Sequence, residues 1–150
     1  KGGYMKLRSI FFYGCFAFAA ISCVTQKTYV ATSKDSRDKV FDMVQSMVAQ
    51  KNYNILDANK GAGFIRAEKA TMNAALRVFS GMESYDQLQI TVFLQNGVSA
   101  VRVQPASFQE RTNGYGIKNR DTMAASESVT RDAKEILQQF GEVSEVEQGG

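Results

Sequence analysis

The sequence predicts an α+β domain, with an antiparallel β-sheet of about four to five strands and two amphipathic helices packed on one face. Three observations support this. Two segments carry apolar residues at helical spacing, several others alternate with a period of two, and Asn96-Gly97 joins two alternating segments. The expected order is β-α-β-β-β-β-α. Because each helix has one apolar stripe and the sheet one apolar face, both helices should cover the same face.

The first elements are a short strand over residues 26–32 and a helix over about 36–51. Ser and Asp residues at 33–36 can cap the first turn of that helix, and Asn52 is a plausible stop. Apolar residues in the helix are spaced by one, three and four, which makes a single stripe. The stripe consists of Val40, Phe41, Val44, Met47 and Val48.

A first hairpin is expected next, with strands at 53–57 and 64–69 and a turn at 59–63. Gly61 and Gly63 are interpreted as glycines that supply positive φ in the turn, because no Gly-Lys-Ser/Thr sequence follows to make a phosphate loop. Residues 71–82 mix both periods and predict an irregular or strand-like connector, with a short helix as the alternative.

The second hairpin joins residues 87–95 to 98–104 through Asn96-Gly97, a dipeptide typical of two-residue type I′ turns. With these two residues as the loop, one face becomes apolar and the other polar. This register pairs Val92 with Val101 and Ile90 with Val103 on one face, and Thr91 with Arg102 and Gln89 with Gln104 on the other. Pro105, which lacks a backbone donor, is expected to end the pairing.

Residues 106–120 are predicted to form a long polar loop. Its notable side chains are Arg111, Tyr115, Lys118 and Arg120. One interpretation is a partner-binding loop with Tyr115 as the single aromatic anchor among cations. The other is a solvated connection without a binding role.

The last helix is expected to be capped by Asp121 or Thr122. Its apolar stripe consists of Val129, Ala133, Ile136, Leu137 and Phe140. The acidic tail at 142–150 is predicted to be frayed.

An export signal precedes these elements. Lys6 and Arg8 come before an apolar run at 10–21, and small residues then lead to Cys23. This order is typical of a signal peptide, which we expect to span residues 1–22.

The remaining boundaries follow from this signal. Residues 1–4 lie before Met5 and are interpreted as a non-native or mis-set start. Residues 23–150 contain one proline and no Gly/Ser-rich linker, so we expect a single periplasmic domain.

The tetrapeptide at 20–23 resembles a bacterial lipobox, with Ala20 in the position where Leu is usual. That resemblance implies a diacylglyceryl group on the Cys23 thiol and an N-terminal lipid anchor. Two alternatives remain open. Cleavage after the Ala-x-Ala sequence at 17–19 would leave a secreted or soluble periplasmic protein. An uncleaved anchor is the other, although the run at 10–21 is short of the roughly 20 residues of a spanning helix.

Charge and composition argue against several classes of function. Three of the 18 basic residues precede Cys23 and all 15 acidic residues follow it, so the remainder is neutral and gives no indication of nucleic-acid binding. The chain has no histidine, which removes the usual general base and the commonest metal ligand. Its other cysteine, Cys15, lies in the expected signal peptide, so the domain has no internal disulfide.

The order of the elements resembles the repeated domain of the C subunit of the outer-membrane barrel-assembly machinery. The helix followed by the segments at 53–56 and 63–67, and the hairpin beginning at 87, carry this likeness over about 27–140. It implies a periplasmic accessory or scaffolding role without catalysis. Val24, where inner-membrane lipoproteins usually have Asp, implies sorting to the outer membrane.

The sequence therefore predicts a lipid-anchored accessory or scaffold protein that binds a protein partner in the cell envelope, with no catalytic residues, no metal and no cofactor. The alternative is a carrier of a small apolar or lipid ligand between helix and sheet. That hypothesis requires a cavity lined by residues such as Phe41, Phe79, Phe93 and Phe140.

Overall fold

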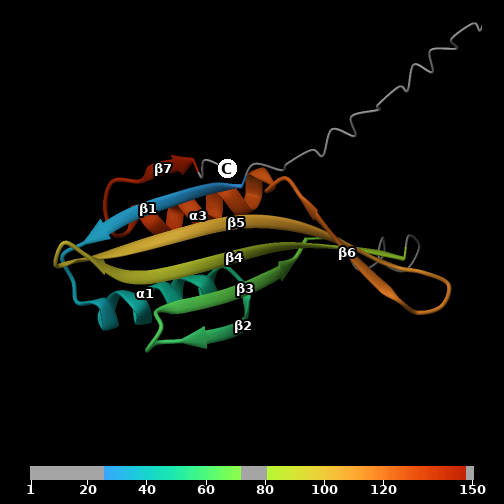
Figure 1. Cartoon of the computed structure of the whole chain (residues 1–150), viewed down its shortest axis with the longest axis horizontal. Helices are drawn as coiled ribbons and strands as arrows, with labels where there is room; N and C mark the ends of the chain where they lie inside the picture. Colours follow the sequence, from blue (N-terminus) through green and yellow to red (C-terminus); the bar gives the residue numbers. More distant parts are fainter. Residues whose placement is uncertain (1–25, 72–80, 148–150) are drawn as a thin grey trace, which may run out of the picture.

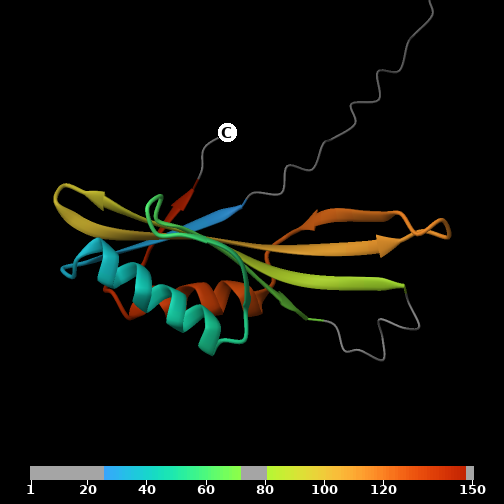
Figure 2. The ribbon, with the colours of Figure 1, turned by 90° about the horizontal axis from the view of Figure 1, so that it is seen from below.

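The computed structural model describes residues 26–71 and 81–147. It shows an α+β domain in which a seven-stranded antiparallel sheet carries two helices on one face (Figures 1 and 2). The expected fold class is confirmed, but four to five strands was too few. The two unexpected strands are β6 and β7, which formed no part of the predicted order.

The elements in chain order are β1 (Lys27–Ser33), α1 (Arg37–Gln50), β2 (Asn54–Asn59), β3 (Phe64–Ala70), β4 (Met82–Gln95), β5 (Val98–Thr112), β6 (Lys118–Met123), α3 (Glu127–Gln138) and β7 (Ser144–Glu147). In space the strands follow the order β2-β3-β4-β5-β1-β7, and β6 also pairs with β5.

The hairpin of β4 and β5 has the predicted register. Asn96 and Gly97 have φ values of 53° and 82°, as a type I′ turn requires. Val92 pairs with Val101 and Ile90 pairs with Val103. All of these valines and Ile90 are fully buried, so the apolar face of the hairpin faces the core as expected.

The prediction that Pro105 ends the pairing was wrong, because β5 continues through it to Thr112. One edge of β5 is shared: β1 pairs with residues 99–103, and β6 pairs with residues 107–112. Pro105 lies in the interval between these two registers, where no described residue is paired with β5 on that edge. A residue without an N–H is accommodated at such an interval.

The two helices bury the apolar face of the sheet, and Figure 2 shows both on the same side of it. α1 lies close to the predicted range, with Ser36 as N-cap and Asn52 at a φ of 62° immediately after its end. The largest fully buried side chains are Tyr29, Ile65, Leu88, Ile90, Ile136, Leu137, Val40, Val44, Val48, Val92, Val101 and Val103. These residues come from both helices and four strands, so the core is one continuous layer.

The cap of α3 is Ser126, and the prediction of Asp121 or Thr122 was wrong. Both of those residues belong to β6, which continues to Met123. Ser126 Oγ accepts a hydrogen bond of 3.1 Å from the N–H of Val129, the usual side-chain cap of a helix start.

The first hairpin, β2 and β3, is confirmed, but of its two turn glycines Gly63 has a positive φ and Gly61 does not, so the prediction for Gly61 was wrong. Gly63 has a φ of 70°, and a Cβ there would lie 2.0 Å from the carbonyl oxygen of Val92. Arg37 holds the turn and β4 together, since its Nε donates to Val92 O at 3.2 Å and its Nη2 donates to Gly61 O at 2.8 Å. The start of α1 therefore holds the hairpin turn against β4.

Two further predictions concern the ends of segments. The tail was expected to be frayed from residue 142, but residues 144–147 form β7 and pair with β1. Most of the ambiguous stretch at 71–82 lies outside the described residues, as do the signal segment and Cys23.

Candidate functional site

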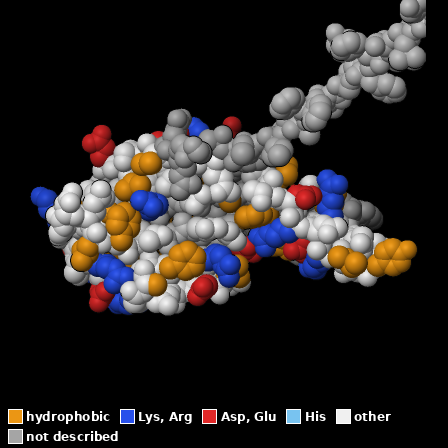
Figure 3. Space-filling model, in the orientation of Figure 1, with side chains coloured by type: hydrophobic (Ala, Val, Ile, Leu, Met, Phe, Trp, Pro, Cys, Tyr) orange, Lys and Arg blue, Asp and Glu red, His pale blue; other side chains and the backbone are white. Residues whose placement is uncertain are grey.

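Among residues 26–71 and 81–147, no helix or strand packs over the face of the sheet opposite α1 and α3, and we call this the open face. Figure 1 looks onto it, with the strands in front of the helices. Phe64 and Phe93 lie here, each half-buried, and the Arg102 guanidinium lies 5.2 Å from the centre of the Phe93 ring. Figure 3 shows apolar and basic side chains interspersed over this face. An uncovered antiparallel sheet is usually polar on its outer face, so these aromatic rings are unusual.

One end of the sheet projects beyond both helices (Figure 2). We call this projection the arm and define it as residues 107–123, the distal part of β5, the turn at 113–117 and β6. Residues 82–86 of β4 pair along its other side. The predicted loop at 106–120 was therefore wrong, because a solvated loop does not form a register of six consecutive pairs with its neighbour.

The tip of the arm is a closed turn. The Asn113 side-chain oxygen accepts hydrogen bonds from the N–H groups of Tyr115 and Ile117, at 3.0 and 2.9 Å. Gly116 has a φ of 77°, which explains a glycine at this position. Tyr115 is 92% exposed and Ile117 is 57% exposed. Two large side chains with apolar surface thus extend into solvent from an ordered turn.

The four predicted partner-binding residues do not form one group. Lys118 and Arg120 alternate with Asn119 on β6 and lie on the open face. Arg111 is on the opposite face of the arm, where its Nη2 lies 3.2 Å from the Gln109 side-chain oxygen. Tyr115 is in the turn at the tip, outside the paired residues of β5 and β6.

An aromatic and cationic cluster forms where the arm joins the open face. Arg120 lies 4.3 Å from the ring centre of Phe108 and 5.6 Å from that of Tyr85, and it forms an ion pair with Glu68. Gln87 donates to the same Glu68 oxygen at 2.6 Å. These contacts link four neighbouring strands, so the arm is held by side chains as well as by the ladder.

Most of this cluster was missed in the sequence, although a signal existed. Tyr85 pairs with Phe108, and this pair follows from the Asn96-Gly97 turn if the same register is carried past Pro105. Because the predicted strand ended at Pro105, the prediction did not include the pair of Tyr85 and Phe108. Beside the cluster, a hydrogen bond of 2.6 Å to Glu110 raises the pKa of Lys118.

A charged network lies on the helix face, centred on Asp132, which is 7% exposed. The Tyr53 hydroxyl donates to it at 3.0 Å and Lys51 donates at 3.2 Å, while Lys69 Nζ lies 3.5 Å away. Burial alone would raise the pKa of Asp132, but the hydrogen bonds from Lys51 and Tyr53 outweigh burial and lower it. Burial and the nearby Asp132 charge raise the pKa of Tyr53.

A second buried carboxylate, Asp86, is 1% exposed and holds the start of α3. Ser107 Oγ donates to it at 2.6 Å, and Ser126 Oγ lies 2.9 Å from Oδ2. The N–H of Ser126 in turn donates to Ser107 Oγ at 2.9 Å. Both buried acids are thus satisfied by neighbouring side chains, and this arrangement accounts for them as structural groups.

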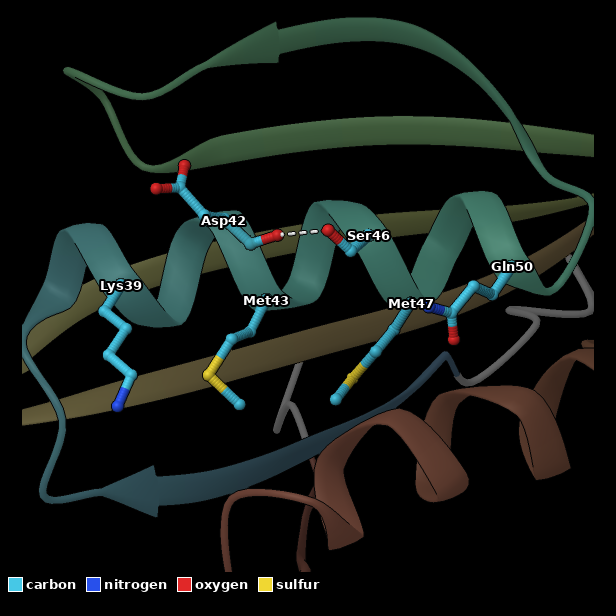
Figure 4. A pocket seen from close by; sticks show the side chains of 6 residues that line it. All are labelled: Lys39, Asp42, Met43, Ser46, Met47 and Gln50. Atoms are coloured by element: carbon cyan, nitrogen blue, oxygen red, sulfur yellow. Dashed lines mark hydrogen bonds between the residues drawn. The ribbon is translucent and has the colours of Figure 1, made fainter.

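A shallow hollow of about 550 Å³ lies along α1 on the helix side. Figure 4 shows Met43 and Met47 pointing toward α3, whereas Asp42 points away from it. A second hollow shares Met47 and Gln50 and continues between the two helices. Both hollows open to solvent and lie outside the interface between helix and sheet.

The three described residues among those proposed to line a ligand cavity do not meet in one. Phe41 is buried in the core, whereas Phe93 lies on the open face and contacts Arg102. Phe140 packs against the edge of the core, and Phe79 lies outside the described residues.

Within residues 26–71 and 81–147, no three His, Cys, Asp or Glu side chains are grouped as a metal site would require. No helix in this described part is long and apolar enough to cross a bilayer. No protein-family model matches the chain, and no curated protein aligns with it significantly.

Proposed function

We propose that this protein is a lipid-anchored periplasmic accessory protein that binds a protein partner in the cell envelope through the open face of its sheet. The proposal involves no catalysis, metal or cofactor. The observation that carries it is a set of half-buried aromatic side chains on a sheet face that neither α1 nor α3 covers, namely Phe64, Tyr85, Phe93 and Phe108.

The composition of this face is that of a protein interface. Aromatic residues and arginine are enriched at such interfaces, where their large side chains are buried against the partner. Arg102 lies against Phe93, and Arg120 lies against Phe108. Both guanidinium groups are therefore ordered before a partner arrives, which reduces the entropy lost on binding.

Anchoring rests on the sequence. The lipobox-like segment ending at Cys23 supports attachment to the outer membrane on its periplasmic side, through N-terminal acyl chains. Two or more acyl chains give stable membrane attachment, whereas one chain is marginal.

Site-specific photocrosslinking in living bacteria tests the partner surface. A photoreactive amino acid at Gln89, exposed in the middle of the open face, should give a discrete adduct with one envelope protein. The matched control is Gln138, an exposed glutamine on α3. Adducts from Gln138 alone, or none from any exposed position on the open face, would refute the proposed binding surface.

Lipid attachment is tested separately. Metabolic labelling with a fatty acid should mark the unmodified chain and fail to mark the Cys23→Ser variant. Mass spectrometry should find the mature protein beginning at an acylated Cys23. A mature terminus upstream of Cys23 without fatty acid would remove the anchor from the proposal and leave the partner surface to stand on its own test.

A further inference from the structure

We infer that the tip of the arm is a second membrane contact, at which Tyr115 and Ile117 enter the interfacial layer of the same bilayer that holds the N-terminal anchor. This inference rests on the anchoring part of the proposed function. It assigns the tip to lipid and leaves the open face to the protein partner.

The first observation is where the chain enters the sheet. Gln104 Nε2 donates a hydrogen bond of 2.6 Å to the Gln26 side-chain oxygen, so Gln26 lies beside the middle of β5, at the base of the arm. Cys23 is three residues upstream. A chain of three residues spans at most about 11 Å, so the bilayer must lie close to the base of the arm.

The second observation is direction. β1 is antiparallel to β5, so β1 enters the sheet from the end of the molecule toward which β5 runs into the arm. β6 occupies the edge of β5 from Ser107 onward, next to the start of β1. The point of attachment and the arm therefore belong to the same end of the sheet, as Figure 1 shows for β1 and β6.

The lengths of the tether and of the arm limit how the domain can stand on the bilayer. From Gln104, beside the tether, β5 runs eight residues to Thr112 near the tip of the arm, about 27 Å at the usual rise per residue. The tether of about 11 Å is shorter, so an arm standing upright on the bilayer would drive its tip through the headgroups. An arm that lies at a shallow angle avoids this overlap and brings its tip to the depth of the headgroup layer, which is the orientation that the inference assigns.

The chemistry of the tip suits that depth. Tyrosine has an apolar ring and a polar hydroxyl, and it is enriched where membrane and water meet. Ile117 adds apolar surface, and the turn already satisfies its backbone donors through Asn113. In water these side chains remain 92% and 57% exposed and contribute little to folding.

The chain has no tryptophan, so a single introduced tryptophan reports on its own surroundings. The full-length chain carrying Tyr115→Trp is reconstituted into vesicles of phosphatidylethanolamine and phosphatidylglycerol. We expect its emission to shift to shorter wavelength and to be quenched by lipids with brominated acyl chains. The matched control, Leu94→Trp, is 63% exposed beside the turn at the opposite end of the sheet and should show neither effect.

Equal quenching of both tryptophans by aqueous acrylamide, with no quenching of Trp at 115 by brominated lipid, would overturn the inference. So would a crosslink from position 115 to a protein in place of lipid. Vesicle flotation and mass spectrometry of Cys23 report attachment separately. A chain that lacks acyl groups but is held by residues 10–21 would still bring the arm to the bilayer. Loss of acylation is therefore seen by mass spectrometry, whereas loss of the tip contact is seen as absent quenching by brominated lipid.

Discussion

The Tyr53 hydroxyl donates a hydrogen bond of 3.0 Å to Oδ2 of Asp132, which joins the residue before β2 to α3 beneath the sheet. Tyr53 is 4% exposed, so little water can replace the hydroxyl. Lys51 and Lys69 complete the surroundings of the carboxylate. The link therefore fixes α3 relative to the segment that follows α1.

Tyr53→Phe should lower the free energy of unfolding by roughly 1–2 kcal/mol, because the buried carboxylate loses a donor but keeps two lysines. Urea denaturation followed by circular dichroism measures this. Tyr115→Phe is the control, since that hydroxyl is exposed at the tip and its loss should leave the urea midpoint unchanged. A Tyr53→Phe midpoint equal to that of the unmodified protein would contradict a stabilising role for this bond.

The lowered pKa of Asp132 predicts a dependence of stability on pH. The folded state holds the carboxylate ionised more readily than the unfolded state does. Its stabilising effect is therefore fully present above the unfolded pKa, about 3.9, and is lost as pH falls through the lower folded pKa. Urea midpoints measured from neutral pH down to about pH 3 should fall less steeply for Asp132→Asn than for the unmodified protein. If the urea midpoints of the two proteins fell equally with pH, Asp132 would not be a source of the pH dependence.

Gly63→Ala should destabilise the protein by roughly 2–4 kcal/mol, because its φ of 70° disfavours a side chain and a Cβ would overlap the Val92 carbonyl oxygen. Two controls separate these causes. Gly97→Ala has the same φ problem in open space and should have an effect of about 1 kcal/mol, and Gly114→Ala has neither problem. Thermal unfolding should rank the three variants in this order. A Gly63→Ala variant no worse than Gly97→Ala would show that β4 moves to accept the methyl group.

Ser126→Ala should lower the free energy of unfolding by roughly 2–3 kcal/mol, since it removes both the cap of α3 and a hydrogen bond to buried Asp86. The comparison is Ser36→Ala at the start of α1. Ser36 is also an N-cap, but its side chain makes no cap hydrogen bond, so a change of a few tenths of a kcal/mol is expected. Equal urea midpoints for the two variants would count against the role of Asp86.

The sequence predicted the parts of the fold that depend on local pattern. The register of β4 and β5 follows from one turn dipeptide and the alternation beside it, because a slip by one residue would expose Val92 and Val101. α1 follows from its apolar stripe. In both cases the information lies within a few residues of the element that it determines.

The parts that were mispredicted depend on distant segments. β6 is almost entirely polar and exposed, so its sequence carries no alternation, and only the free edge of β5 makes it a strand. β7 likewise forms on the edge of β1, more than a hundred residues away in the chain. The cluster around Arg120 also depends on a distant segment, since its ion-pair partner Glu68 lies on β3.

The position of β1 between β5 and β7 has a mechanical consequence. Any tension on an N-terminal anchor acts along the axis of β1, and the hydrogen bonds of an antiparallel ladder are perpendicular to that axis. A pull from the membrane therefore loads all of those bonds together, in shear, and does not open them one after another. Through β1, the proposed anchor would transmit force to the proposed partner surface on the sheet without first separating the strands.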